Sequence, residues 1–348
     1  MRINGKRLTI IGVLAAVGGS TAAIAQKSYV ASGSAGEITL PARPPITYLW
    51  RQPQDISAEN LFYGRGGMEH EPHGPFTFEK EDLEGTNPKY DVRDQDGVKW
   101  KIKLGAEARP ETVATRFVWA MGYYTDEDYF LPVVQVSGMP AHVHRGEDLI
   151  GPDGMMRNVR LKREELGKKV ANWSWKDNPF VATREMDGLR VMMAVINNWD
   201  LKDENNAIRD FKKGDENGDT REYEVSDLGA SFGTTGRKFS HTKSKGNLHQ
   251  YAISNFITKE RPDSVDFNVP SRPPLMLAFD PHEYVDRLDM RWIGDAIPRL
   301  NARWLGDLLG QLSQDQIRDA FRAGGYDGEE LNEFVVEFQK RIAALKRL

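Results

Sequence analysis

The fold is decided by two short stretches of the sequence, Trp199-Asp200-Leu201-Lys202-Asp203-Glu204-Asn205 and Asp227-Leu228-Gly229. The first follows residues 184–197, whose apolar side chains recur at the i, i+3, i+4, i+7 spacing of an amphipathic helix. The second follows a predicted strand at residues 222–226. Each stretch is therefore predicted to form a loop that a regular element holds in place.

Together the two stretches resemble the catalytic loop HRDLKxxN and the DFG motif of the protein-kinase superfamily, in the same order and context. The resemblance implies that Asp200 orients the acceptor hydroxyl and accepts its proton, and that Lys202 stabilises the moving phosphoryl group. It also implies that Asn205 and Asp227 bind the Mg²⁺ (or Mn²⁺) that accompanies ATP. These residue types suit the chemistry, because phosphoryl transfer depends on positioning and on neutralising spread negative charge. Magnesium prefers oxygen ligands.

A strand of alternating character lies upstream, at residues 98–104 (VKWKIKL). Its period of two places apolar side chains on one face and Lys99, Lys101 and Lys103 on the other. The kinase resemblance implies that Lys103 grips the α- and β-phosphates of ATP. Lys101 is the competing candidate, because it shares the same face.

The helix predicted from Pro110 to Gly122 carries Glu111, which matches the glutamate that pairs with the kinase lysine. Glu107 is the fallback, since Glu111 comes unusually early in that helix. No GxGxxG motif is present. Its place is taken by Gly85-Thr86-Asn87-Pro88-Lys89, so Gly85 and Lys89 are predicted to contact the nucleotide. This loop is more similar to the atypical branch, such as persistence-toxin serine kinases and phosphoinositide kinases.

The order of elements predicts an α+β protein of two lobes, a small β-rich lobe and a larger helical lobe. We expect the small lobe at residues 76–161 and the large lobe at residues 162–348. Residues 26–75 begin rich in Ser, Gly, Ala and Pro, and are predicted to be an extended leader. Trp199 stands where the catalytic-loop arginine of kinases is usual, which argues against activation through a phosphorylated activation loop.

Residues 1–25 have the pattern of a cleaved secretory signal: basic residues up to Arg7, an apolar run at residues 8–17, and Ala23-Ile24-Ala25 before Gln26. The apolar run is too short for a spanning helix, so a periplasmic or secreted protein without an integral membrane segment is expected. The absence of cysteine excludes disulfides and thiolate chemistry. After cleavage, 44 basic and 51 acidic residues remain, a balance that argues against nonspecific nucleic-acid binding.

The predicted function is therefore an exported ATP-dependent phosphotransferase that acts on a hydroxyl of a protein, a sugar or a lipid. Two alternatives stay open: an inactive pseudokinase that binds nucleotide or metal, and a nucleotidyl (AMP) transferase on the same fold. Two histidine pairs, His70 with His73 and His142 with His144, have the spacing of metal ligands. No third ligand accompanies either pair at motif spacing, so ordinary polar loops are the simpler interpretation.

Overall fold

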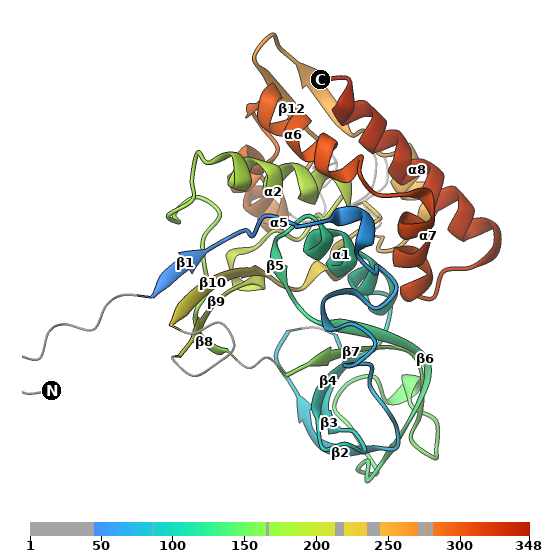
Figure 1. Cartoon of the computed structure of the whole chain (residues 1–348). Helices are drawn as coiled ribbons and strands as arrows, with labels where there is room; N and C mark the ends of the chain where they lie inside the picture. Colours follow the sequence, from blue (N-terminus) through green and yellow to red (C-terminus); the bar gives the residue numbers. More distant parts are fainter. Residues whose placement is uncertain are drawn as a thin grey trace, which may run out of the picture. The chain divides into compact units, whose positions relative to one another are not determined.

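The computed structural model describes residues 45–85, 87–164, 167–212, 219–234, 244–270, 277 and 281–348. Within these residues the chain has α+β architecture, with a small lobe built on a β-barrel and a larger, mainly helical lobe (Figure 1). In the described part, no helix combines the length and hydrophobicity needed to cross a membrane.

The small lobe contains a five-stranded barrel and one long helix that packs beside it. Its elements are β2 (Phe76–Asp82), β3 (Lys89–Arg93), β4 (Lys99–Lys103), α1 (Ala108–Ala120), β6 (Asp128–Ser137), the 3₁₀ turn η3 (Glu147–Leu149) and β7 (Met155–Arg163). The strands follow the order β2-β3-β4-β7-β6, and parallel pairing of β6 with β2 closes the barrel.

The large lobe combines a mixed sheet, a three-stranded sheet and several helices. The mixed sheet contains β1 (Ile46–Tyr48), β10 (Thr220–Val225), β9 (Asn206–Phe211), β8 (Lys168–Ala171) and β5 (Tyr124–Thr125), which pairs with β10. The second sheet contains β11 (Ile257–Glu260), β12 (Ser264–Phe267) and β13 (Ile297–Pro298). The helices are α2 (Arg184–Val195), α3 (Leu248–Ile253), α5 (Pro281–Asp289), α6 (Arg299–Leu309), α7 (Gln314–Ala323) and α8 (Gly328–Lys346).

The alternating sequence of β4 explains how the barrel separates a dry interior from a polar exterior. Trp100 and Ile102 are buried in the interior with Tyr90, Val92 and Leu161 from the neighbouring strands. Because side chains alternate across a strand, the intervening lysines of β4 project from the outer face. The predicted strand and its two faces are thus confirmed, and the outer face is the one that carries the site.

Helix α1 connects the two lobes. It begins at Ala108, two residues before Pro110, whose fixed φ suits a first helical turn. Phe117 stacks on Phe338 of α8 with ring centroids 4.0 Å apart, while the helix also packs on β6 and β7. Arg109 donates to the Gly325 carbonyl and lies 3.1 Å from Glu330. The helix that carries Glu111 is therefore held by both lobes.

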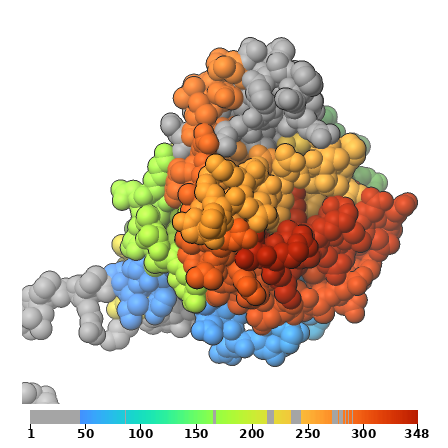
Figure 2. All heavy atoms as spheres, turned by 90° about the horizontal axis from the view of Figure 1, so that it is seen from above, coloured from blue at the N-terminus to red at the C-terminus, as the bar shows by residue number. Residues whose placement is uncertain are grey.

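Residues 45–75, predicted as part of an extended leader, are instead packed against the folded chain. Strand β1 pairs with β10, and Leu49, Ile56 and Leu61 are buried in the larger core. The turns η1 (Ile56–Ala58) and η2 (Gly64–Gly66) lie in this segment. Figure 2 shows the segment, in blue, along the edge of the red C-terminal helices, where Gln316 donates to two of its carbonyls. The apolar residues of this segment are scattered and follow no period, so no local pattern indicates this packing.

Candidate functional site

Lys103 lies at the centre of the candidate site, at the end of β4. Its ammonium nitrogen is 2.8 Å from Glu111, 2.6 Å from Asp227 and 3.0 Å from Glu107. Only 1% of the Lys103 side chain is exposed. Burial alone would lower its pKa, but the carboxylates of Glu111 and Asp227 more than offset this, so the pKa is raised and the ammonium stays charged.

The structure separates Lys103 from its competitor. Lys101 lies on the same outer face, but its ammonium group binds Asp82 at 2.5 Å and Asp91 at 2.8 Å, on β2 and β3. Lys103 lies two residues further along β4, closer to the start of α1. Of the two lysines, it is therefore the one that reaches Glu111 and Asp227. The prediction of Lys103 over Lys101 matches this geometry.

Both candidate glutamates contact Lys103, through different surroundings. Glu111, in the first turn of α1, is fully buried and also accepts a hydrogen bond from Arg160 at 3.0 Å. Glu107 occupies the N-cap position of α1 but makes no capping hydrogen bond. The predicted pair with Glu111 is present, and Glu107 is an additional partner rather than a substitute.

Asp227 lies two residues after the end of β10 and adopts a left-handed conformation, with φ 53° and ψ 52°. Left-handed backbone is uncommon outside glycine, and Asp and Asn tolerate it best. Burial would raise the pKa of Asp227, but the Lys103 ammonium outweighs it and holds the pKa well below its usual range. The carboxylate is therefore ionised at any working pH, with 38% of the side chain exposed.

The catalytic-loop residues follow α2, as predicted. The loop is tied to the segment after Asp227, because the Trp199 amide donates to the Ala230 carbonyl at 3.2 Å. Asn205 ends the 3₁₀ turn η4 (Asp203–Asn205). Its side-chain amide donates to the Asp200 carbonyl at 2.9 Å, and its backbone carbonyl accepts from the Ser226 backbone amide at 3.0 Å. Asn205 is thereby placed beside Asp227.

Asp200 and Lys202 lie at the exposed side of this loop. The Lys202 ammonium is 3.7 Å from Asp200, and about half of the Lys202 side chain is exposed. Burial raises the pKa of Asp200 above its usual value, despite the opposing effect of Lys202. A carboxylate of raised pKa is a better proton acceptor than an ordinary aspartate, provided that it remains ionised.

The turn between β2 and β3 takes the place predicted for the nucleotide loop. Gly85 has φ +67°, and a Cβ added to it would lie 3.4 Å from the Lys89 ammonium nitrogen. Burial and the nearby Lys103 lower the pKa of Lys89. Thr86 lies outside the described residues. Gly85 and Lys89 thus lie together at this turn, and the positive charge of Lys103 acts on Lys89.

The oxygen-bearing side chains fit a hard divalent cation. Asp227 supplies a carboxylate, one oxygen of which accepts a hydrogen bond from Lys103. The side-chain amide nitrogen of Asn205 donates to the Asp200 carbonyl, so the side-chain oxygen of Asn205 is the atom that could bind a metal. Carboxylate and amide oxygens are ligands that Mg²⁺ accepts. Asp227 and Asn205 would therefore hold the metal.

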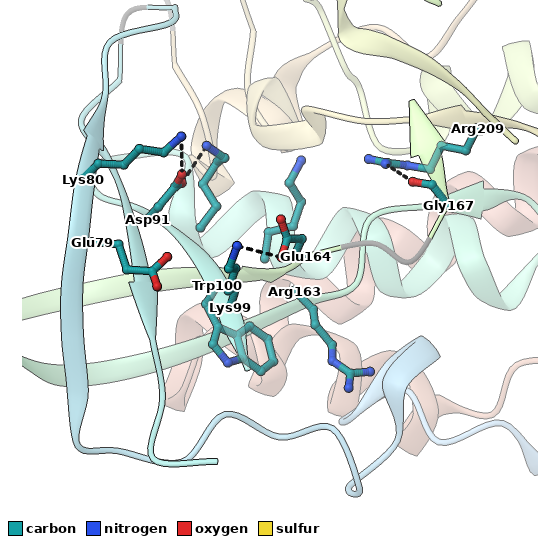
Figure 3. Close-up of a pocket in the computed structure, with 11 residues that line it drawn as sticks. Glu79, Lys80, Asp91, Lys99, Trp100, Arg163, Glu164, Gly167 and Arg209 are labelled. Carbon is teal, nitrogen blue, oxygen red and sulfur yellow. Dashed lines mark hydrogen bonds and ion pairs between the residues drawn. The ribbon is translucent and has the colours of Figure 1, made fainter. Parts of the chain in front are cut away.

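A cavity of about 420 Å³ lies along the outer face of the barrel beside Lys101, and neither Lys103 nor Asp227 lines it. It is lined by residues of β2, β3, β4 and β7 and, from the large lobe, by Gly167 and Arg209. Figure 3 shows Lys80 directed at Asp91, Lys99 at Glu164, and Arg209 at the Gly167 carbonyl. The volume is within the usual range for small-molecule sites, about 300–1,000 Å³, but this lining is unusually rich in charge.

A second ionic cluster, which sequence reasoning missed, lies behind Glu111. Arg160 on β7 is fully buried and lies 3.7 Å from Asp128, while Lys162 lies 3.2 Å from Asp126. Neither Asp128 oxygen has a hydrogen-bond partner among the described residues. Burial raises the pKa of Asp128 to about 7, whereas Lys162 and Arg160 outweigh burial at Asp126 and lower its pKa. Asp128 is therefore the carboxyl that takes up a proton as the pH falls through neutrality, while Asp126 stays ionised.

Asp128→Asn is expected to stabilise the protein at pH 8 and to have little effect near pH 4. The pKa of Asp128 is about 7 in the folded protein and about 3.9 when unfolded. Folding therefore takes up a proton between these values, and the stability of the wild type falls as the pH rises through this range. Asparagine removes this loss, which is of the order of a few kcal/mol.

Thermal unfolding of both proteins across this pH range measures the difference. Asp126→Asn is the matched control, because Asp126 has a lowered pKa and its loss should destabilise the protein at pH 8. Equal effects of the two substitutions would contradict the assignment.

The histidine pairs do not converge as metal ligands in the structure. His70 and His73 lie beside Glu127 and Asp96, and His142 and His144 lie beside Glu147 and Glu81. Each ring therefore faces a carboxylate of its own.

No family model and no curated protein sequence matches the chain. Among solved structures, the proinflammatory kinase CtkA of Helicobacter pylori is similar over 78% of this chain and 95% of its own, with 11% identity and a TM-score of 0.43. The Rio2 kinase–ADP/Mg²⁺–phosphoaspartate complex of Chaetomium thermophilum is similar over 77% and 72%, with 11% identity and a TM-score of 0.31. The amicoumacin kinase hAmiN, in complex with AMP-PNP, Ca²⁺ and Ami, is similar over 78% and 90%, with 11% identity and a TM-score of 0.21.

A β-rich lobe presents Lys103 to a glutamate of the following helix and to the aspartate that follows β10. By this order of elements, the chain has an α+β fold of two lobes in which Lys103, Glu111 and Asp227 meet at one site.

Proposed function

We propose that the chain is an ATP-dependent phosphotransferase that transfers the γ-phosphoryl group of Mg·ATP to a hydroxyl. The observation that carries the proposal is the buried ammonium of Lys103, held between Glu111 and Asp227, residues that are 8 and 124 positions away in the sequence. A lysine that is buried with more than one carboxylate is a costly arrangement for stability alone. Its retention beside a left-handed Asp227 favours a functional role.

Each residue has a role that follows from its position. Lys103 and Lys89 would bind phosphate oxygens, since the Lys103 ammonium lies 2.6 Å from Asp227 and the charge of Asp227 also acts on Lys89. Asp227 and Asn205 would hold Mg²⁺, which supplies charge neutralisation on the phosphoryl oxygens when bound. Asp200 would orient the acceptor hydroxyl and accept its proton, and Lys202 would face the transferred group.

The cavity along the outer face of the barrel could hold the rest of the nucleotide. Lys101 and Lys162 line it, and both are neighbours of Lys103 on the same face. A second cavity, of about 560 Å³, lies on the catalytic loop itself. Its lining includes Lys202, Asp203 and Glu204, together with Trp175 and Trp292. We assign it to the acceptor, since aromatic rings beside charged groups suit a polar molecule of modest size.

Incubation of the protein with ATP labelled at both the α- and the γ-phosphate tests the reaction. The protein's own hydroxyls and a panel of proteins, sugars and lipids serve as acceptors. Transfer of the γ label supports the phosphotransferase, and transfer of the α label would instead identify a nucleotidyl transferase. Nucleotide binding without transfer of either label to any acceptor would favour the pseudokinase.

We also propose that the protein acts outside the cytoplasm, because residues 1–25 have the composition of a cleaved signal. A fusion of residues 1–30 to a reporter is expected to be exported, and the mature protein to begin near Gln26. The intact mass of the exported protein measures the cleavage point. A full-length species retained in the cytoplasm would contradict export.

A further inference from the structure

The carboxylate of Glu107 is the point at which three segments of the candidate site meet. Its Oε2 accepts hydrogen bonds from the Asn87 amide at 2.7 Å and from the Lys103 ammonium at 3.0 Å. Its Oε1 accepts from the ammonium of Lys245. Only 6% of Glu107 is exposed, so these three donors, from three separate segments, enclose it.

The three donors come from the segments that surround a nucleotide's phosphates in the proposed function. Asn87 lies in the turn between β2 and β3, Lys103 ends β4, and Lys245 follows the Asp227-Leu228-Gly229 segment. Lys245 also lies over the ring of Trp199, with its ammonium 5.5 Å from the ring centroid. The catalytic loop therefore contacts the same lysine.

Glu107 does not serve the structure in the way its position would suggest. The side chain of a residue at an N-cap often accepts a hydrogen bond from the first turn of its helix, and the Glu107 side chain accepts none there. Its side chain is directed instead past Gly229, where an added Cβ would lie 2.6 Å from the Glu107 Cβ. A glycine at 229 is what permits this approach.

A carboxylate held in this way resembles a bound phosphate group. Two oxygens on one centre accept charge-assisted hydrogen bonds from ammonium groups on both sides, which is how lysines also hold a phosphate. Lys103 already has Glu111 and Asp227 as partners, so Glu107 is the third carboxylate on one ammonium. Burial would raise the pKa of Glu107, but Lys103 and Lys245 more than offset this, and the pKa is lowered. Glu107 is thus an anion held by hydrogen-bond donors of the kind that bind phosphate.

We propose that Glu107 occupies the position of a nucleotide phosphate in the nucleotide-free protein, and that Asn87 and Lys245 are further phosphate-binding residues that Glu107 releases when nucleotide binds. The inference rests on the proposed function of the same site, and it assigns the ligand chemistry as the oligophosphate of a nucleotide. Glu107 and the phosphates compete for the same donors, so the wild-type affinity for nucleotide is held below what the lysines alone would give.

Glu107→Gln tests the competition, because glutamine keeps the shape and removes the charge. Binding of Mg·ATP and of inorganic tripolyphosphate, measured by calorimetry, is expected to tighten by about tenfold or more, since one nearby negative charge is lost. Glu111→Gln is the matched control: it removes a carboxylate from the same lysine but leaves the donors of Glu107 in place. We expect less tightening or none from it. Unchanged or weaker binding by Glu107→Gln, with wild-type binding intact, would overturn the inference and leave the proposed function standing.

Lys245→Met, alone and combined with Glu107→Gln, tests the role of Lys245. As a phosphate ligand, Lys245 should contribute about tenfold to ATP affinity in both backgrounds. If it only neutralises Glu107, its removal will cost nothing once Glu107 is uncharged, and the assignment of Lys245 fails.

Thermal unfolding checks that each variant is folded. If Glu107→Gln does not fold, Glu107→Asp takes its place, because the shorter side chain withdraws the carboxylate from the donors. Absence of ATP and tripolyphosphate binding in every variant and in the wild type would remove the proposed function together with this inference, a result distinct from the failure of the inference alone.

Discussion

Asp200→Asn is expected to lower the turnover of phosphoryl transfer by a factor of about 10² to 10⁴, the usual contribution of a positioned general base. The affinity for Mg·ATP should remain nearly unchanged. Within the described part of the chain, Asp200 contacts Lys202 and, through its backbone carbonyl, Asn205, and no hydrogen bond or ion pair joins it to Lys103 or Asp227. Asparagine preserves the shape and the backbone while removing the proton acceptor.

A transfer assay run beside a titration of nucleotide binding measures both quantities. Lys202→Met is the companion variant, because Lys202 lies on the same loop with its ammonium 3.7 Å from Asp200 and is largely exposed. It should reduce turnover without the loss of folding. If Asp200→Asn abolishes nucleotide binding but leaves the rate of bound substrate unaltered, Asp200 belongs to the metal site and the assignment is wrong.

Asp227→Asn is expected to weaken the binding of Mg·ATP by more than about 100-fold, the upper range of the effect of removing groups that merely support a metal ligand. A charged ligand to a hard cation is lost, and so is the carboxylate that lies 2.6 Å from Lys103. Asparagine is chosen because, like aspartate, it tolerates the left-handed backbone at φ 53°. The change therefore removes charge without adding backbone strain.

Asp227→Ala is the matched comparison, since it removes the same charge but also fits the left-handed backbone poorly. Nucleotide titrations at several Mg²⁺ concentrations separate a loss of metal affinity from a loss of nucleotide affinity. Unaltered binding by Asp227→Asn, together with unaltered turnover by Asp200→Asn, would remove the support for catalysis at this site.

The parts of the site that depend on local pattern could be predicted from the sequence. The period-two run at residues 98–104 gave both β4 and the face that carries Lys103. Pattern alone could not choose between Lys101 and Lys103, because a strand's period gives the face of a residue and not its distance from the next element. That choice came from likeness to kinases, and the contacts with Glu111 and Asp227 agree with it.

Residues whose roles depend on non-local packing were missed. Arg160, Asp126 and Asp128 are charged residues in or beside strands that the sequence marks only as apolar. Lys245 reaches Glu107 across 138 residues, and no local spacing announces such a pair. Glu107 itself was considered only as a replacement for Glu111, since nothing in one sequence suggests that one lysine binds both.

Strand β9 and the packed residues 45–75 were missed for a related reason. Strand β9 follows the catalytic loop without an interval of turn residues. Strand β1 is three residues long and pairs in parallel with β10, which begins at Thr220. Parallel pairing needs no hairpin, so it leaves no turn signal beside it.

The packing of residues 45–75 has a consequence for the order in which the chain folds. Ile46 pairs with Thr220, and the carbonyls of Ile56 and Glu59 accept from Gln316, contacts that span 174, 260 and 257 residues. Contacts of such wide separation are slow to form, because a long loop must close before they yield any stabilisation. Of the described residues, these are the earliest to be synthesised and among the last to find their partners. Their edges and apolar side chains stay exposed until nearly the whole chain is available, which makes this stage of folding the one most open to chaperones and to aggregation.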